Sequence, residues 1–377
     1  MTNDYTVGVH PARSSLWQKL LRVERIPDIH AVYGFFHGLR PGRHPLRVVS
    51  WPSTRYHVFW PSFAKRAIPV LNHLLMAPRL LAAWGNNGLV MVREFDNLWV
   101  LLLLPVLLAM RSRTLLNINQ NFSPPLGRGI RGGALRVLVR LGFNFLWLDG
   151  EAGRADVARA YPGIRLITAL FPVTPAPHGV RRQRDADRPY VVGFVGYFRA
   201  EKGGVAGVVE AASALAGMQG VQVKIGFWND AQREQAASAT EAGIELANTY
   251  EPAQYHQFIA ACDAVVILAE RSGYYYRHSG ILMDCINRGT IPICPRYPVF
   301  ESIVSRPVPV GATYGDIAEL PSVVEAVMRD HERLCAGFVR HVALRSPRHV
   351  TIAIEQFMAP LPDCRIVRTF ENKEEET

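Results

Sequence analysis

The alternation of strand-like and helix-like segments constrains the fold of this chain more than any other feature. Short apolar runs such as Val221–Phe227 and Ala264–Ala269 are separated by longer segments of helical pattern. These longer segments are Val205–Met218, Ala231–Ala242, Pro252–Ala261 and Gly280–Arg288. Strands that alternate with helices at this spacing predict βαβ units and parallel sheets. We therefore expect an α/β protein.

The same alternation is present in the first half of the chain. The strands expected there are Ile29–Phe36, Leu46–Ser50, Gly88–Arg93, Thr114–Ile118, Phe143–Leu148 and Gly163–Ala169. The expected helices are Phe63–Trp84, Leu98–Met110, Ile130–Leu141 and Glu151–Ala160. These segments predict a parallel sheet in this half as well.

The length of the chain predicts two domains, because 377 residues exceed one typical hydrophobic core. The segment Val173–Arg188 interrupts the alternation with prolines and charges, which is typical of an interdomain linker. We expect one domain over residues 1–172, a linker over 173–189, a second domain over 190–360 and a tail over 361–377.

The positive charge lies in the first half of the chain. Residues 1–189 contain 25 Lys and Arg against 10 Asp and Glu, a net charge of +15, whereas residues 190–377 contain 17 against 22, a net charge of −5. A basic surface attracts an anionic membrane, a phosphorylated acceptor or nucleic acid. Nucleic acid is not expected, because the chain has no helix-turn-helix, RNP or zinc-finger signature.

The cysteines and the N-terminus favour a cytosolic protein. The five cysteines form no CxxC pair and have no histidines at metal-ligand spacing, so we expect neither disulfides nor a metal site. The N-terminal segment Met1–Leu21 has no apolar core of the kind that a signal peptide carries.

One apolar run raises the question of membrane insertion. Leu98–Met110 is wholly apolar, but it has 13 residues and contains Pro105, whereas a membrane span needs about 20 residues. A buried helix of an α/β domain is the favoured interpretation. The alternative is an apolar face that dips into a bilayer, which also suits the nearby segment Leu71–Gly85.

A loop bounded by glycines is the first candidate for a binding site. An apolar strand pattern ends at Gly196, and Gly203 opens a long helical segment. The N–H groups and the dipole at a helix N-terminus attract anions, and Arg199 and Lys202 in this loop would add positive charge beside a phosphate. The alternative is an ordinary β–α turn with two solvated cations.

Three motifs follow one another along the second half of the chain. They are the loop Gly196–Gly203 with its Glu-Lys-Gly sequence, the paired helix–strand units Tyr255–Leu268 and Ser279–Ile293, and the tail Val308–Met328. In this order they resemble the motifs of GT-B glycosyltransferases related to the group-1 family, which is retaining and uses nucleotide sugars. The resemblance extends from Tyr190 to about Pro360, and before Tyr190 it rests on the order of strands and helices.

The resemblance implies two Rossmann-like doubly wound domains that face a cleft, with a nucleotide sugar bound by the second. It implies that Lys202 contacts the diphosphate and that the backbone at Gly196 and Gly203 approaches it. Asp284 would accept hydrogen bonds from the ribose diol. Such enzymes use no metal, because cationic side chains and helix N-termini stabilise the leaving diphosphate. No cofactor besides the donor is expected.

The chain departs from this family pattern at two positions. Tyr197 stands where the family has Arg or Lys directly after the glycine, and Arg199, two residues on, is the expected substitute. Tyr276 stands where the family has its first glutamate, eight residues before Asp284, and Glu270 is the nearest acid. The alternatives are a surface arginine at position 199 and an ordinary helix acid at position 284.

An aromatic and basic insert precedes Asp284. We expect Arg277 to pair with the diphosphate or a donor carboxylate, and His278 to be a polar donor contact or a packing residue. Ser279 and Gly280 would present backbone N–H groups at the start of the next helix.

The fourth expected strand of the first domain also departs from the family. Many relatives carry a histidine after this strand, near the reacting carbon, and no general base is evident here. The strand runs instead into side-chain amides that could bind a sugar hydroxyl: Asn117, Asn119, Gln120 and Asn121.

These features predict a cytoplasmic glycosyltransferase, retaining and metal-independent, that moves a hexose from a UDP- or GDP-sugar to a lipid-linked or polysaccharide acceptor. Cations near the start of the chain fit docking on the anionic inner face of the cell membrane: Arg40, Arg43, Arg47, Arg55, Lys65, Arg66 and Arg79. Two other functions stay open. One is a nucleotide-sugar epimerase of the UDP-N-acetylglucosamine type on the same fold, and the other is a non-catalytic GT-B subunit that stabilises a partner transferase.

Overall fold

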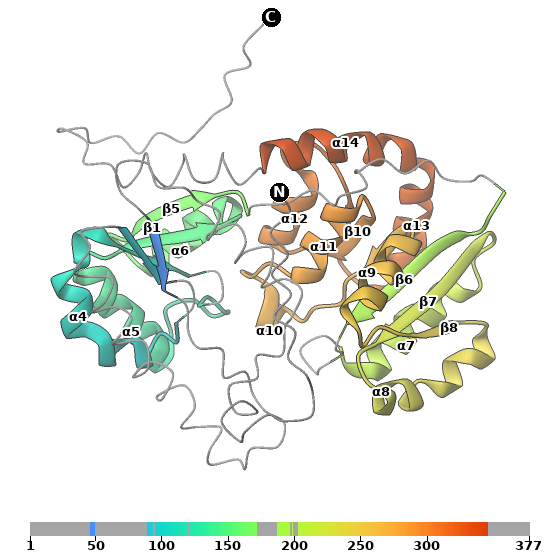
Figure 1. Ribbon diagram of the computed structural model, residues 1–377, viewed down its shortest axis with the longest axis horizontal. Coiled ribbons are helices and arrows are strands. Elements are labelled where there is room, and N and C mark those ends of the chain that lie inside the picture. Colours follow the sequence, from blue (N-terminus) through green and yellow to red (C-terminus); the bar gives the residue numbers. More distant parts are fainter. Residues whose placement is uncertain are drawn as a thin grey trace, which may run out of the picture.

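Two parallel sheets lie in separate halves of the molecule (Figure 1). The computed structural model describes residues 46–49, 89–92, 95–118, 121–171, 187–196, 198 and 203–345. The expected strand 29–36, the expected helix 63–84, most of the linker and the C-terminal tail lie outside the described residues. The α/β class is confirmed, and the expected domain boundaries stay predictions.

The first sheet is five-stranded and parallel, with its strands in chain order. The strands are β1 (Leu46–Val49), β2 (Leu89–Val92), β3 (Thr114–Asn117), β4 (Asn144–Leu148) and β5 (Arg165–Ala169). The described helices of this half are η1 (Trp99–Leu103), α4 (Leu104–Ala109), η2 (Arg111–Arg113), α5 (Gly129–Arg140), η3 (Glu151–Gly153) and α6 (Arg154–Ala160). β3 and β4 are buried along their whole length, as central strands of a covered parallel sheet are.

The second sheet is six-stranded and parallel, in the order β11-β10-β9-β6-β7-β8. Its strands are β6 (Tyr190–Gly196), β7 (Val221–Phe227), β8 (Glu245–Asn248), β9 (Ala264–Val266), β10 (Ile291–Pro295) and β11 (Ala312–Tyr314). β6 lies inside the sheet and is buried throughout. The strand order reverses at β6, because β7 and β8 lie on one side of it and the later strands lie on the other. This is the doubly wound arrangement.

Helices of the second half connect these strands. They are α7 (Gly204–Ala216), α8 (Asp230–Gln235), η5 (Ala237–Ala242), α9 (Pro252–Ala261), α10 (Arg271–Tyr274), α11 (Gly280–Arg288), α12 (Pro298–Ser305), η6 (Ile317–Glu319), α13 (Leu320–Arg329) and α14 (His331–Leu344). α11 has the expected bounds because local signals set them. It ends at Gly289, whose φ of 67° is a left-handed conformation that glycine adopts readily.

The apolar run Leu98–Met110 forms two short helices instead of the single expected one. Pro105 lies in the first turn of α4, where its missing N–H is not needed, and the residues before α4 form η1. One face of the run is buried, as expected of a core helix, whereas Leu102 is 46% and Leu108 is 40% exposed. Among the described residues, no helix combines the length and the apolar character needed to cross a membrane.

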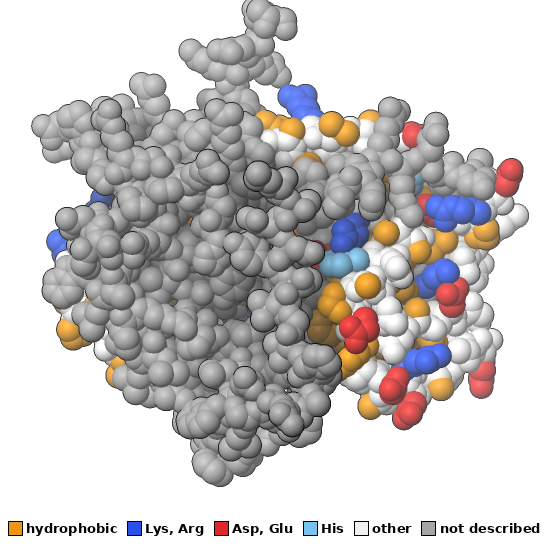
Figure 2. All heavy atoms as spheres, viewed as in Figure 1, with side chains coloured by type: hydrophobic (Ala, Val, Ile, Leu, Met, Phe, Trp, Pro, Cys, Tyr) orange, Lys and Arg blue, Asp and Glu red, His pale blue; other side chains and the backbone are white. Residues whose placement is uncertain are grey.

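The surface of the second half mixes charges of both signs (Figure 2). Several lie in ion pairs, such as Lys224 Nζ with Glu245 Oε2 at 2.8 Å and Arg296 Nη2 with Glu319 Oε2 at 3.5 Å. Exposed pairs of this kind contribute little to stability. The excess of positive charge in the chain therefore belongs to the first half.

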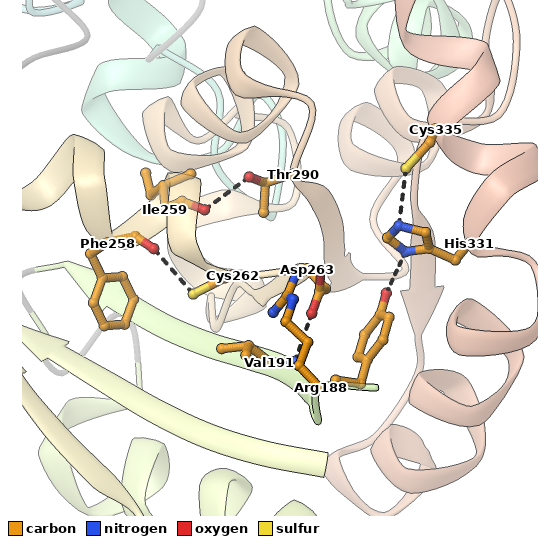
Figure 3. A network of polar contacts seen from close by, with 10 residues as sticks. Arg188, Val191, Phe258, Ile259, Cys262, Asp263, Thr290, His331 and Cys335 are labelled. Atoms are coloured by element: carbon orange, nitrogen blue, oxygen red, sulfur yellow. Dashed lines mark hydrogen bonds and ion pairs between the residues drawn. The ribbon is translucent and has the colours of Figure 1, made fainter. Parts of the chain in front are cut away.

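A network of polar contacts holds the amino ends of the central strands (Figure 3). Arg188, at the end of the expected linker, pairs with Asp263 at 2.5 Å, and Asp263 Oδ2 accepts a hydrogen bond from the backbone N–H of Val191 at 2.8 Å. His331 at the start of α14 lies 3.4 Å from the sulfur of Cys335. Asp263 thus ties the linker end to β6 and to the start of β9, on the edge of the sheet opposite to the strand ends that bind ligands.

Neither a disulfide bond nor a metal-binding cluster is found among the described residues. None of the four described cysteines is in a disulfide, and Cys364 lies outside the described residues. Within the same part of the chain, no cluster of His, Cys, Asp and Glu side chains could hold a metal ion.

The last described helix joins the two halves. Arg345, directly after α14, forms an ion pair with Asp149 at the end of β4, with Nη2 and Oδ1 2.8 Å apart. Both side chains are completely buried. The same carboxylate accepts a hydrogen bond from the backbone N–H of Phe171 at 3.1 Å. α14 therefore ends on the first half of the molecule.

Candidate active site at the carboxyl edge of the second sheet

The carboxyl ends of β6 and β9 form the edge at which doubly wound sheets bind ligands. The two strands are hydrogen-bonded neighbours, but the chain continues from β6 toward β7 on one side and from β9 toward β10 on the other. A crevice forms outside the strand ends at such a reversal of strand order. The glycine loop and the insert before Asp284 both follow these two strands.

Gly196 ends β6 in a backbone conformation that L side chains rarely adopt. Its φ is +129°. A Cβ at this position would lie 2.9 Å from Cδ1 of Ile281, in the first turn of α11. The end of β6 and the start of α11 are therefore packed directly against each other, as expected of a glycine that allows close approach.

Replacing Gly196 with valine is expected to weaken UDP binding at least tenfold. A β-branched side chain is strained at this φ, and its Cβ displaces Ile281 and the start of α11. Isothermal titration with UDP measures the effect. Gly207→Ala is the matched control, because Gly207 lies inside α7 with open space around it and alanine is a better helix former. Equal UDP affinities of the two variants would contradict a role for Gly196 in the site.

Both described ends of the glycine loop lie at this edge of the sheet. Phe198 is buried, and its ring centroid is 5.6 Å from that of Phe227 at the end of β7. Gly203 has a φ of 75°, and a Cβ there would lie 3.9 Å from Cδ1 of Leu268, which follows β9. The loop ends therefore join the carboxyl ends of three neighbouring strands. Three predicted site residues of this loop lie outside the described residues, and their roles stay predictions: Tyr197, Arg199 and Lys202.

α11 brings a second helix N-terminus to the same edge. Ser279 is its N-cap residue, is 3% exposed and makes no side-chain capping hydrogen bond. Gly280 is the first helical residue, and the next residue, Ile281, packs at Gly196. With the start of α7 at the other end of the loop, two sets of backbone N–H groups and two positive dipole ends are available for an anion. Ser279 and Gly280 thus lie at the helix start that packs on Gly196, and their expected contacts with the donor stay predictions.

Asp284 lies in the second turn of α11 and is 6% exposed. Its Oδ2 accepts a hydrogen bond of 2.9 Å from the hydroxyl of Tyr255 in α9. A buried carboxylate with such a donor is held in one orientation. The ribose contact expected of Asp284 stays a prediction. Sequence reasoning did not identify Tyr255 as its partner, because the pattern of α9 marks Tyr255 only as a buried aromatic.

Glu270 provides an exposed carboxylate at this edge. It follows β9 by four residues and is the N-cap residue of α10. The hydroxyl of Ser272 donates to its Oε2 at 3.4 Å. The neighbouring Arg271 lies over the ring of Tyr275, 4.3 Å from its centroid. Glu270 therefore lies near the carboxyl ends of β6 and β9, which we call the donor edge, and its expected contact with the donor stays a prediction.

The segment Tyr276–His278, which we call the clasp, connects the second half with the first. The hydroxyl of Tyr276 donates to Asp156 Oδ2 in α6 at 3.2 Å, and its ring packs edge-on against Trp147 at a centroid distance of 6.2 Å. Burial, together with the charge of Asp156, raises the pKa of Tyr276 to about 12, so the hydroxyl stays protonated and donates. The tyrosine that replaces the first glutamate of the family is thus a contact between the two halves.

The other two residues of the clasp also face the first half. Arg277 Nε donates to the backbone carbonyl of Phe122 at 3.3 Å, and the ring of His278 lies 4.4 Å from that of Phe171. His278 therefore has the packing role that the sequence left open. The structure places Arg277 beside the first half, and its expected contact with the diphosphate stays a prediction.

A cavity of about 500 Å³ lies where Arg277 meets the first half. It is formed by the chain after β2, the chain after β3 and the first turn of α5. Asn97 and Asn121 make its polar wall: Asn121 Nδ2 donates to Asn97 Oδ1 at 2.5 Å, and Asn97 Nδ2 donates to the backbone carbonyl of Asn121 at 3.1 Å. Asn121 is one of the amides expected to bind a sugar. Asn117 is buried in β3, and Asn119 and Gln120 lie outside the described residues.

Sequence reasoning missed the cavity itself. Its floor is the segment 123–132, whose prolines and glycines are typical of a loop but do not reveal what the loop encloses. Gly132 packs so closely that a Cβ would lie 2.5 Å from the carbonyl carbon of Gly127. The glycines at positions 127 and 132 were therefore the one signal in this segment, and they indicate a close approach of the backbone and not the cavity itself.

Comparisons with known proteins find similarity to solved structures only. No family model and no curated protein sequence matches the chain. Among solved structures, α,α-trehalose 6-phosphate synthase from Burkholderia multivorans is 12% identical with a TM-score of 0.55, over 79% of this chain and 77% of that one. HepE of Anabaena, solved with UDP and glucose, is 14% identical with a TM-score of 0.50, over 79% and 82%. The pneumococcal O-GlcNAc transferase GtfA, solved with UDP and GlcNAc, is 12% identical with a TM-score of 0.52, over 72% and 56%.

These likenesses concern the architecture of the chain. The chain spans little more than half the length of the pneumococcal transferase. Identities this low show a shared fold, and a fold does not by itself establish a reaction. In this chain the architecture consists of two parallel sheets, with a reversal of strand order at β6 in the second. The protein has the GT-B fold, in which two Rossmann-like α/β halves face each other.

Proposed function

We propose that the protein is a glycosyltransferase that moves a hexose from a UDP- or GDP-sugar to a lipid-linked or glycan acceptor. The observation that carries this proposal is the packing of Gly196 against Ile281, which sets the end of β6 beside the N-terminus of α11. A diphosphate bound in that crevice would meet the N-termini of α7 and α11.

The chemistry of the proposed reaction suits these groups. Transfer of the sugar leaves a nucleoside diphosphate, on which negative charge builds up in the transition state. Preorganised N–H groups, helix dipoles and the cation of Lys202 would stabilise that charge without a metal ion. Retention of configuration at the sugar is part of the proposal, on the resemblance of the motifs between Tyr190 and Pro360.

The proposed binding of the nucleotide-sugar donor is supported by the positions of residues at the donor edge and by the ligands of similar structures. HepE and the pneumococcal GtfA were both solved with UDP, which supports a uridine nucleotide here. Asp284 would bind the ribose. Tyr276 offers no carboxylate to sugar hydroxyls, and among the described residues Glu270 is an exposed carboxylate that follows β9 at this edge.

Association with an anionic membrane on the cytoplasmic side is a further part of the proposal. Its support is the net charge of +15 over residues 1–189 and the exposed Leu102 and Leu108 of η1 and α4. Basic residues beside exposed leucines are typical of proteins that lie on a membrane surface.

A thermal-shift panel of UDP, GDP, ADP and their sugars tests the donor assignment. A nucleotide present at 100 times its dissociation constant stabilises the folded state by about 2.7 kcal/mol. We expect UDP or GDP and its sugar to raise the unfolding temperature, and ADP to have no effect. No response to any nucleotide would overturn the proposal.

Turnover assays separate the proposed function from two others. A transferase releases UDP or GDP only when an acceptor is present, whereas an epimerase converts the donor sugar with no acceptor. The presence of Tyr276 where the resembled family has its first glutamate keeps a non-catalytic subunit as the second candidate, because this position offers no carboxylate to a donor and its hydroxyl donates to Asp156 instead. Nucleotide binding without turnover on every acceptor supplied would support that candidate.

A further inference from the structure

The cavity beside the clasp is built where a ligand of the first half is expected. Its walls follow the carboxyl ends of β2 and β3, which are neighbouring parallel strands. At about 500 Å³ it has the size of a small-molecule site. Asn97 is 6% exposed and is tied to Asn121 by reciprocal hydrogen bonds, so the polar wall is held in place.

The charges that line the cavity favour an anion. Its charged lining residues include three arginines, Arg128, Arg131 and Arg277, and one acid, Asp96. Asp96 is already compensated, because Arg131 Nη2 lies 3.0 Å from its Oδ2 and the backbone N–H of Leu98 donates to its Oδ1 at 2.9 Å. The charged side chains of the lining are thus three arginines against one carboxylate. Such a concave basic site raises the local concentration of anions.

The first turn of α5 strengthens this preference. Residues 129–132 line the cavity, and Arg128, the N-cap residue, makes no side-chain capping hydrogen bond. The first turn of this 12-residue helix contains no acidic residue. No acidic side chain of the helix's own first turn offsets the positive end of its dipole, which acts on the cavity together with Arg128.

Arg277 reaches the cavity from the other half of the molecule. The contacts of Tyr276 with Asp156 and of His278 with Phe171 hold the residues on both sides of it against the first half. Arg277 Nε donates to the backbone carbonyl of Phe122, which is part of the cavity wall. Two residues later, Ser279 begins α11 at the donor edge. The cavity and the donor edge are thus connected through the clasp.

We propose that this cavity binds a phosphate group of the acceptor, with Arg128 and Arg277 as its cationic contacts. The proposal rests on the proposed transferase function, because it assigns the acceptor of that reaction to the class of phosphate esters. Guanidinium groups match phosphate oxygens in geometry and charge. The sugar-accepting part of such an acceptor lies between the cavity and the donor edge.

Titration of inorganic phosphate into the full chain, with UDP at saturation, tests the proposal by calorimetry. UDP occupies the donor edge, so phosphate that still binds does so elsewhere. We expect the wild type to bind phosphate, and Arg128→Ala and Arg277→Gln each to raise its dissociation constant at least tenfold. Arg128 is exposed, so its replacement leaves the fold intact even if Arg277→Gln disturbs the clasp.

Arg140→Ala is the matched control. Arg140 is exposed in the last turn of the same helix, about 18 Å from Arg128 at the rise of an α-helix, and its replacement removes the same charge. We expect its dissociation constant for phosphate to stay within twofold of the wild type. Equal phosphate affinities of the Arg128 and Arg140 variants would overturn the proposal, as would a wild type that binds no phosphate beside UDP.

Two further probes identify the source of the phosphate. Glycerol 3-phosphate represents a soluble ester, and phosphatidylcholine vesicles that contain a polyprenyl phosphate represent a lipid-linked one. The probe that competes with inorganic phosphate for the wild type, and does not for Arg128→Ala, identifies the source of the phosphate. If neither probe competes, the assignment of a phosphate ester as acceptor is overturned. Failure of both UDP and GDP to bind is a separate result, which removes the transferase function. The same variants without any nucleotide still decide whether the cavity binds phosphate.

Discussion

Lys202→Ala is expected to lower the rate of sugar transfer by about 10²- to 10³-fold with the unfolding temperature unchanged. Removal of one preorganised group that stabilises transition-state charge has effects of this size. Lys202 lies between Phe198 and Gly203, whose described positions place both ends of the loop at the donor edge. Its ammonium group is therefore expected near the leaving diphosphate, where charge develops. Release of UDP or GDP in the presence of acceptor measures the rate.

Lys224→Ala is the matched control for this experiment. Lys224 lies in β7 and pairs with Glu245 at 2.8 Å, so its replacement removes a lysine from the same half of the molecule without touching the loop. We expect its transfer rate to stay within a factor of about two, since an exposed ion pair contributes at most about 1 kcal/mol to stability. Full activity of Lys202→Ala would disprove the assignment of the donor loop.

Arg345→Met is expected to lower the free energy of unfolding by about 3–5 kcal/mol. This is the usual cost of removing one partner from a buried ion pair, because the other charge stays buried without compensation. Arg345 and Asp149 are both completely buried, and Arg345 Nη1 also donates to Asp149 Oδ2 at 2.9 Å. Burial and the charge of Arg345 lower the pKa of the nearby His341 to about 3, so this histidine is neutral in the native protein and the cation that faces Asp149 is that of Arg345. Urea unfolding measures the change.

The double variant Asp149→Asn with Arg345→Met tests whether the buried charge is the cause. Asparagine keeps the left-handed conformation of position 149, where φ is 54°, and it still offers an oxygen to the N–H of Phe171. We expect the double variant to recover at least half of the lost stability, since neutral replacements of buried ion pairs are often tolerated. If it is as unstable as Arg345→Met alone, packing of the arginine and not its charge holds α14 on the first half.

Local patterns in the sequence were sufficient for many elements of the fold. β7, α9 and α11 have the expected bounds, because strand pattern, an N-terminal proline and a C-terminal glycine act within a few residues. The expected helix 231–242 is divided into α8 and η5, and α10, α12 and α14 were not anticipated. Where these helices begin and end depends on how they pack against other elements. The periodicity of the sequence does not show that packing.

For the candidate site, the sequence alone identified the glycine loop, the start of α11 and the charge of the first half, because each depends on residues close together in the chain. Tertiary structure decided the rest. The hydroxyl of Tyr276 donates to Asp156, 120 residues away, Arg277 contacts Phe122 across 155 residues, and Arg345 pairs with Asp149 across 196. No local pattern specifies such partners, because they meet only when the two halves pack together. The sequence shows Tyr276 only as a departure from the resembled family, which has a glutamate at this position. The packed structure shows that Tyr276 belongs to the contact that brings Arg277 to the cavity.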